Sequence, residues 1–136
     1  MTSKNTDVFR ISVINRQMID GEYDTVNESA NGTFREKNGK FFIAYKNSGI
    51  TSMIKLDGET LSVKRVGDIR SDMLFVRGES TSFEYGTKYG SMDMSIFTED
   101  ISCSFDRDGG MLKLRYLLMT GGDDIINDMT IKSKLY

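Results

Sequence analysis

Short stretches of alternating apolar and polar residues, rich in Val, Ile, Thr, Phe and Tyr, follow one another along the whole chain. Turn dipeptides interrupt them about every 8–12 residues, which is the spacing of an all-β chain of hairpins. Asn-Gly, Asp-Gly and Gly-Gly pairs supply the positive φ that tight hairpin turns require. The expected turns are Asn38-Gly39, Asp57-Gly58, Tyr89-Gly90, Glu99-Asp100, Asp108 to Gly110 and Gly121-Gly122.

Each tight turn fixes which residues face one another, so the register of every hairpin follows from its turn. The facing residues are mostly apolar on one side of the hairpins and mostly polar on the other. The hairpins therefore share a single apolar inner face, on which the lone Cys103 is expected to be buried. The expected inner-face pairs are Phe34 with Ile43, Ile54 with Leu61, Tyr85 with Met94, Ile96 with Cys103, and Leu114 with Met129.

A sheet of about eight to ten antiparallel strands can hide one apolar face by folding into a sandwich or by closing into a barrel. An open sheet usually protects its edge strands with proline or with short, charged strands. This chain has no proline, and its strands are long and evenly spaced. Because closure removes the edges, we expect an all-β antiparallel meander closed into a barrel, with a sandwich as the alternative. Residues 7–136 are expected to form this single domain, after a poorly ordered N-terminus of residues 1–6.

The composition of the chain restricts its possible chemistry more than it restricts its possible fold. The 136 residues suit one domain, and they include no His, no Trp and one Cys. The absence of His removes the Ser-His and Cys-His nucleophile pairs and the usual zinc ligand sets, so no catalytic residues, no metal and no cofactor are predicted. A net charge of −2 argues against nucleic acid as a partner. No apolar run is long enough for a signal peptide or a membrane span, so we expect no membrane association and a cytoplasmic protein.

The second half of the chain carries a series of short motifs. Arg65-Val66-Gly67 is followed by Met73-Leu74-Phe75, and the most specific stretches are Thr87 to Gly90 and Asn127 to Ile131. In these motifs, and from about Asp7 onward, the chain resembles the uncharacterised YwiB-like family of small bacterial proteins, described as calycin-like (lipocalin-like) β-barrels. The resemblance implies a calycin-like barrel and no particular activity. Secreted lipocalins carry a Gly-x-Trp motif near the first strand, and this chain has no Trp, so no ligand site follows from the resemblance.

A ligand enters such a barrel through the end with the longer loops. The hairpin directions place these loops at residues 20–23, 46–49, 66–68, 89–90 and 107–110. Arg65 shares the apolar face with Leu61 and Val63, where a guanidinium requires an anionic partner or water. It either anchors the acidic group of a ligand, or it reaches solvent or an internal carboxylate. The candidate ligand-binding residues near this mouth are Arg65, Tyr45, Thr87, Tyr89 and Met92.

Two hypotheses of function follow, and neither is enzymatic. In the first, the barrel binds a small amphipathic or anionic ligand at its mouth, and this hypothesis fails if Met and aromatic side chains fill the interior. In the second, the chain is a non-catalytic interaction protein, such as a homodimer, that uses an outer apolar strand face. Enzymatic chemistry requires an inward carboxylate, and the inner-face acids Glu36 and Glu59 lie away from the mouth. The outward apolar residues of the second hypothesis are Leu74, Val76, Leu117, Met119 and Ile126.

Overall fold

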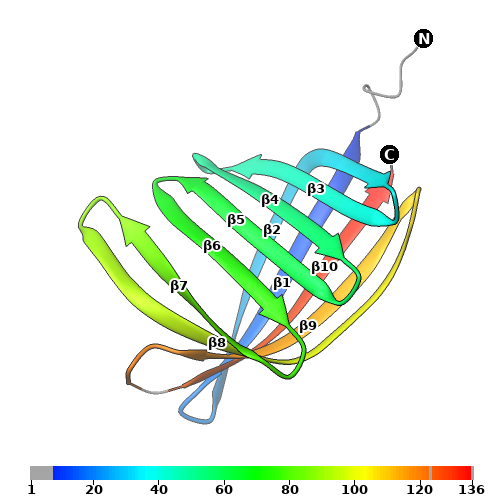
Figure 1. Cartoon of the computed structure of the whole chain (residues 1–136). Helices are drawn as coiled ribbons and strands as arrows, with labels where there is room; N and C mark the ends of the chain where they lie inside the picture. Colours follow the sequence, from blue (N-terminus) through cyan, green and yellow to red (C-terminus); the bar gives the residue numbers. More distant parts are fainter. Residues whose placement is uncertain (1–7, 123, 136) are drawn as a thin grey trace.

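The computed structural model describes residues 8–122 and 124–135, so the segment 1–6 that we expected to be poorly ordered lies outside the described residues. The described chain consists of ten β-strands joined by short turns (Figure 1). The strands are β1 (Phe9–Ile19), β2 (Glu22–Lys37), β3 (Lys40–Asn47), β4 (Ile50–Asp57), β5 (Thr60–Gly67), β6 (Ile69–Val76), β7 (Ser80–Thr87), β8 (Gly90–Asp106), β9 (Gly109–Met119) and β10 (Ile125–Leu135).

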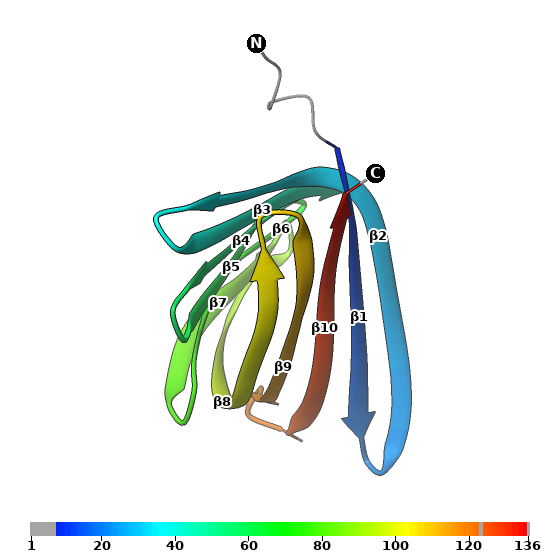
Figure 2. The ribbon, with the colours of Figure 1, turned by 90° about the vertical axis from the view of Figure 1, so that its right-hand side faces the viewer.

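Each strand pairs with the next one along the chain, and β1 also pairs with β10, which closes the sheet into a barrel. Across this closing seam Phe9 faces Leu135 at one end and Met18 faces Ile126 at the other. Figure 2 shows β2, β1, β10, β9 and β8 side by side along one wall. The prediction of an antiparallel meander closed into a barrel of about eight to ten strands is confirmed, and the sandwich alternative is wrong.

The tightest hairpins owe their geometry to residues that tolerate positive φ. Asn38 and Gly39 have φ angles of 54° and 79°, and the same pair of left-handed residues recurs at Asp20-Gly21 and Ser48-Gly49. Such two-residue turns match the right-handed twist of the flanking strands. The register predicted from Asn38-Gly39 is confirmed, since Phe34 faces Ile43. The register predicted around residues 121–122 is also confirmed.

Two other hairpin registers differ from the prediction by two residues. The turn predicted at Asp57-Gly58 is centred one residue later, and the turn predicted at Tyr89-Gly90 is centred one residue earlier. The predicted pairs of Ile54 with Leu61 and of Tyr85 with Met94 are therefore wrong. A shift of two residues nevertheless keeps every side chain on its predicted face of the sheet. The observed pairs are Leu56 with Leu61, Ile54 with Val63, Tyr85 with Met92, and Phe83 with Met94.

The turn predicted at Glu99-Asp100 is wrong, because β8 continues through these residues. The register between β8 and β9 shifts between Thr98 and Asp100, which marks a β-bulge. Glu99 makes an ion pair with Arg115 on β9, with 3.0 Å between Oε2 and Nε, so this acidic pair contacts the neighbouring strand instead of reversing the chain.

Cys103 is the residue most affected by this continuous strand. It faces Leu112 on β9 and not Ile96, because no reversal brings the two halves of β8 together. Its side chain is exposed, so the prediction of a buried thiol is wrong.

The length of β8 also decides which turns share an end of the barrel. Because β8 does not reverse, the prediction that residues 107–110 belong to the mouth is wrong, whereas the other four mouth loops do lie at one end. This end also holds the β9–β10 turn, which we had expected at the opposite end. The turns at the mouth follow β1, β3, β5, β7 and β9, and the turns at the far end follow β2, β4, β6 and β8.

Arg77 contacts β8 at the point where the pairing between β8 and β7 ends. The β7–β8 ladder ends at Phe97, whereas the β8–β9 ladder continues to Asp106. The guanidinium of Arg77 donates a hydrogen bond to the carbonyl of Ile101 and lies 3.2 Å from the carboxylate of Asp100. It also lies 3.3 Å from the carboxylate of Glu59, beside the β4–β5 turn. One side chain therefore joins three elements at the far end of the barrel.

Replacing Arg77 by Met is expected to lower the free energy of unfolding by about 1–2 kcal/mol. The substitution removes one charge-assisted hydrogen bond and two partly exposed ion pairs, and keeps most of the aliphatic stem. Urea unfolding followed by circular dichroism measures this loss, with Arg107→Met as the control on an exposed arginine. Part of the loss is expected to vanish at high salt, which screens the ion pairs but not the hydrogen bond. Equal stability of the two variants would contradict the role assigned to Arg77.

Candidate functional site

The far end of the barrel is closed by aromatic rings. Phe34 packs against Phe9, Phe41 and Phe105, with ring centroids 5.2 to 5.8 Å apart, and Phe41 also contacts Phe105 at 5.4 Å. These four rings come from β1, β2, β3 and β8, so they bring the tip of the β8–β9 hairpin against β2 and β3. Aromatic packing of this kind fills the lumen of a small barrel. We call these four residues the aromatic plug.

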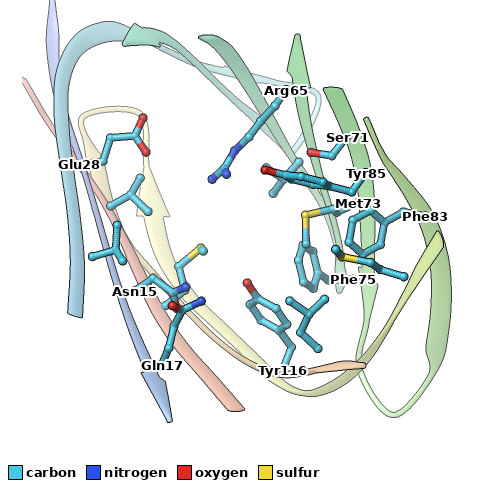
Figure 3. Close-up of a pocket in the computed structure, with 16 residues that line it drawn as sticks. Asn15, Gln17, Glu28, Arg65, Ser71, Met73, Phe75, Phe83, Tyr85 and Tyr116 are labelled. Carbon is cyan, nitrogen blue, oxygen red and sulfur yellow. The ribbon is translucent and has the colours of Figure 1, made fainter. Parts of the chain in front are cut away.

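The half of the barrel nearer the mouth is hollow. It contains a cavity of about 480 Å³ that is partly open to solvent (Figure 3). This volume falls within the range of roughly 300–1,000 Å³ that small-molecule sites occupy. Most of its surface is apolar, with three methionines whose flexible thioethers adapt to different shapes. The apolar lining residues are Val13, Val26, Val63, Met73, Phe75, Phe83, Met94, Leu118 and Met129.

Polar side chains line the same cavity and converge on it from several strands. Figure 3 shows the guanidinium of Arg65 extending into the cavity from one wall, with the Tyr85 ring beside it and the Tyr116 hydroxyl directed inward from below. Sites for small molecules combine an apolar lining with a few such polar groups, which orient the ligand. The polar lining residues are Asn15, Gln17, Glu28, Arg65, Ser71, Tyr85 and Tyr116.

Arg65 points into the cavity because of its place on β5. Side chains alternate along a strand, and Leu61 and Val63 on the same face are buried in the core. Arg65 is only partly exposed, yet the described residues give its guanidinium no hydrogen bond and no ion pair. The five N–H donors of an arginine carry a fixed positive charge whose burial is unfavourable without a partner. The cavity wall therefore has a cationic group without an ion-pair partner among the described residues, although the Glu28 carboxylate lines the same cavity.

Two buried tyrosines surround this charge. Burial raises the pKa of Tyr116 to about 12, because the phenolate would lose its hydration, and the nearby positive charge of Arg65 offsets part of the effect. Burial is also the main reason why the pKa of Tyr45 is raised; Glu28 raises it further, whereas a hydrogen bond with Ser52 lowers it. Both phenols are therefore neutral near pH 7, and Tyr116 can donate a hydrogen bond into the cavity.

The raised pKa of Tyr116 predicts a loss of stability in alkali. Below pH 10 the phenol is protonated in both the folded and the unfolded chain. Between pH 10 and about pH 12 the unfolded chain loses the proton and the folded chain keeps it, so unfolding becomes more favourable as the pH rises. The contribution is roughly 2 kcal/mol at the upper limit. Urea unfolding at a series of pH values is expected to show a steeper decline for the wild type than for Tyr116→Phe; parallel declines would contradict this assignment.

A group of three carboxamides lies at the closing seam, and two of them, Asn15 and Gln17, line the cavity. Asn127 on β10 is fully buried, and its Oδ1 accepts hydrogen bonds from Asn15 Nδ2 and Gln17 Nε2 on β1, both at 3.0 Å. Its own Nδ2 donates to the carbonyl of Ile125 at 3.0 Å. Asn127 thus fixes the orientation of both amides on β1. We call Asn15, Gln17 and Asn127 the carboxamide cluster.

The five residues predicted to bind a ligand do not all lie together. Arg65 lines the cavity as predicted, whereas Tyr45 is buried beside Glu28 and Ser52 and lies outside the lining. Thr87 caps the β7–β8 turn: its Oγ1 accepts a hydrogen bond from the Tyr89 amide at 3.1 Å and donates one to the Gly90 carbonyl at 3.2 Å. Tyr89 is 88% exposed and Met92 is 54% exposed. Thr87, Tyr89 and Met92 do not line the cavity.

Sequence reasoning missed the residues that β1 and β2 contribute, namely Asn15, Gln17 and Glu28. A signal for the carboxamide cluster was present on β10, where Asn127 occupies an inner-face position between Ile125 and Met129. A carboxamide at such a position requires buried partners. No comparable signal marked Glu28, whose carboxylate accepts a hydrogen bond from Asn47 Nδ2 at 3.4 Å.

Among residues 8–122 and 124–135, no three His, Cys, Asp or Glu side chains are grouped so that they could hold a metal ion. In the same part of the chain, no helix has the length and the apolar character needed to cross a membrane.

The ten-strand meander and its hollow half define a small closed β-barrel protein with an internal cavity. The family model described as "Domain of unknown function (DUF1934)" matches residues 11–132, so the chain belongs to this family. The chain is similar to the uncharacterized beta-barrel protein YwiB of Bacillus subtilis (strain 168), with 22% identity over 117 residues that cover 82% of each protein. The crystal structure of the ywiB protein from Bacillus subtilis has a similar fold, with a TM-score of 0.87, 20% identity, and coverage of 96% of this chain and 92% of that one. The family resemblance expected from the sequence is confirmed.

Proposed function

We propose that this barrel binds a small amphipathic or anionic molecule in its cavity, with the acidic group of the ligand at Arg65. The observation that carries the proposal is the guanidinium without a hydrogen bond or ion pair among the described residues, at the wall of an apolar cavity of about 480 Å³. A carboxylate can accept two parallel hydrogen bonds from a guanidinium. The Tyr116 hydroxyl adds a neutral donor from the cavity wall. The plug closes the far end, so the ligand enters from the mouth.

In this role the protein is a carrier or a sensor similar to the calycins, and not an enzyme. Among the described lining residues Glu28 alone carries a carboxylate, and it already interacts with Asn47 and Tyr45. General acid–base chemistry without His would require a second titratable group poised beside the substrate. We further propose that the protein acts in the cytoplasm, a reducing compartment in which its single cysteine, Cys103, would stay a free thiol.

Binding of decanoate, measured by isothermal titration calorimetry, tests the proposed function. Decanol is the matched control, because it has the same apolar chain and no negative charge. We expect saturable binding of one decanoate per chain, and about 10- to 100-fold weaker binding of decanol, since a hydrogen-bonded charge pair is lost. Absence of decanoate binding, or equal affinity for the two compounds, would contradict the proposal.

The outer surface supports a second candidate function, a homodimer. The ladders align Met18, Ile126, Leu117 and Phe97 in one row across β1, β10, β9 and β8, on the outer face. All four side chains are partly exposed. A continuous apolar row on one wall is typical of a surface that another protein covers. Of the outward residues predicted from the sequence, Leu117 and Ile126 belong to this row.

Sedimentation velocity tests the homodimer. A dimer at micromolar concentration that becomes a monomer in Ile126→Lys would support it, with Lys132→Glu on the same strand as the control. A wild-type chain that stays monomeric at high micromolar concentration would contradict it.

A further inference from the structure

The carboxamide cluster leaves hydrogen-bond acceptors unused beside the cavity. Both Asn15 and Gln17 direct their amide N–H groups at the single Oδ1 of Asn127. An amide whose nitrogen is held in this way has its carbonyl oxygen directed elsewhere. Asn15 Oδ1 is buried and has no hydrogen-bond partner among the described residues. An acceptor in this state is unfavourable until a donor reaches it.

Gln17 also donates its amide N–H to Asn127 Oδ1, and its side chain lines the cavity. Its Oε1 has no hydrogen bond from the described residues, and it is not enclosed as Asn15 Oδ1 is. Figure 3 shows Asn15 and Gln17 next to each other on β1, low in the cavity, and Arg65 extending from the opposite wall. The barrel order agrees, because β5 lies four strands from β1 in one direction and six in the other.

The cavity therefore has two poles of opposite hydrogen-bonding character. The cationic guanidinium of Arg65 offers donors on one wall, and the neutral carboxamide oxygen of Gln17 on β1 offers an acceptor on the other. Apolar side chains such as Met73, Phe75 and Leu118 lie among the lining residues around them. A ligand complementary to this arrangement has an acidic group, an apolar body and a hydrogen-bond donor distant from the acid.

We infer that Gln17 forms a second subsite, whose Oε1 accepts a hydrogen bond from a hydroxyl or N–H group at the far end of the ligand. The inference rests on the proposed function and narrows it to bifunctional acids, of which ω-hydroxy carboxylic acids are the simplest class. Asn127 has a positioning role, because its Oδ1 holds the Gln17 nitrogen and leaves the Gln17 oxygen available. A plain fatty acid would place a methyl group against this oxygen and leave it without a donor.

Calorimetric titration with matched pairs of acids tests the subsite. The pairs are octanoate, decanoate and dodecanoate, each compared with its ω-hydroxy counterpart, so that the distance between the two polar groups is varied. We expect about tenfold tighter binding of the hydroxy acid at the chain length that spans the two poles, although its chain is less hydrophobic. This preference is the decisive result, and it is measured on the unmodified protein.

Two variants assign the preference to the subsite. Gln17→Met keeps the side-chain volume, removes the acceptor oxygen and is expected to abolish the preference while the plain acid still binds. Ser12→Ala, on the outer face of the same strand, is expected to retain it. If Gln17→Met fails to fold, the comparison of acid pairs on the wild type still decides the question.

The outcomes separate the two proposals. If none of the acids binds, the proposed function fails and the subsite fails with it. If the plain acids bind and the hydroxy acids show no preference at any chain length, the proposed function stands and the subsite is refuted. In that case water molecules, and not the ligand, satisfy the Gln17 oxygen.

Discussion

Arg65→Met is expected to weaken decanoate binding by about 30-fold or more and, at the same time, to stabilise the protein. The loss of affinity follows from the loss of charge-assisted hydrogen bonds to the carboxylate, which contribute roughly 1.5–3 kcal/mol each. The gain in stability, of about 1 kcal/mol, follows from removing a partly buried charge that has no ion-pair partner among the described residues. Methionine fills a similar volume and suits the apolar wall.

Calorimetry and urea unfolding of the same preparations measure both effects. Arg35→Met is the matched control, since Arg35 is exposed on the outer face of β2 and is expected to change neither quantity. The opposite signs of the two effects are informative. Replacing a residue that serves folding lowers the stability of the protein, whereas replacing a residue that serves binding can raise it. A destabilised Arg65→Met protein with unchanged decanoate affinity would show that Arg65 is structural.

Gly110→Ala is expected to cost at least about 3 kcal/mol of folding free energy. Gly110 is the second residue of β9 and has a φ of 143°, and a β-carbon at this position would overlap the carbonyl oxygen of Ser104 on β8. Positive φ and a backbone collision each add to the cost. The strand displaced by the methyl group carries Phe105, so the aromatic plug is expected to loosen as well.

Gly39→Ala provides the control for this effect. Gly39 also has a positive φ, of 79°, but a β-carbon there would have no atom within 4 Å. The control therefore isolates the conformational cost, about 1 kcal/mol, from the collision. Thermal or urea unfolding of the two variants measures the difference, and equal losses would contradict the steric explanation.

The architecture was predictable because the turns and the alternation agree. A register slip of two residues leaves every side chain on its face of the sheet. The predicted inner face of these hairpins was therefore correct although two turns were misplaced. The prediction failed at Glu99-Asp100, where two acidic residues resembled a turn but belong to a bulge held by Arg115 and Arg77. Nothing in a single strand shows that ion pairs from its neighbours will stabilise it.

The candidate site was predictable only in part, and for a related reason. Arg65 was found because it shares a face with apolar residues on a strand bounded by recognisable turns. The partners across the cavity lie on β1 and β2, whose register no turn had fixed from the sequence. Their convergence on one cavity depends on the β1–β10 seam, a contact between opposite ends of the chain. Thr87 and Tyr89 lie in or beside the β7–β8 turn and Met92 is exposed, so a position near the mouth was not enough to bring them into the cavity lining.

The unequal pairing of β8 has a consequence for solubility. From Asp100 to Asp106 the described ladders give this strand a neighbour on the β9 side alone, so its other side presents a short edge. Unpaired strand edges recruit strands from other molecules. Arg77 covers the Ile101 carbonyl on that edge, and carboxylates lie at either end of it, at Asp100 and Asp106. The bulge, the arginine and the acidic residues thus protect this edge of β8 against aggregation. A barrel whose strands are all paired along their full length would not need such protection.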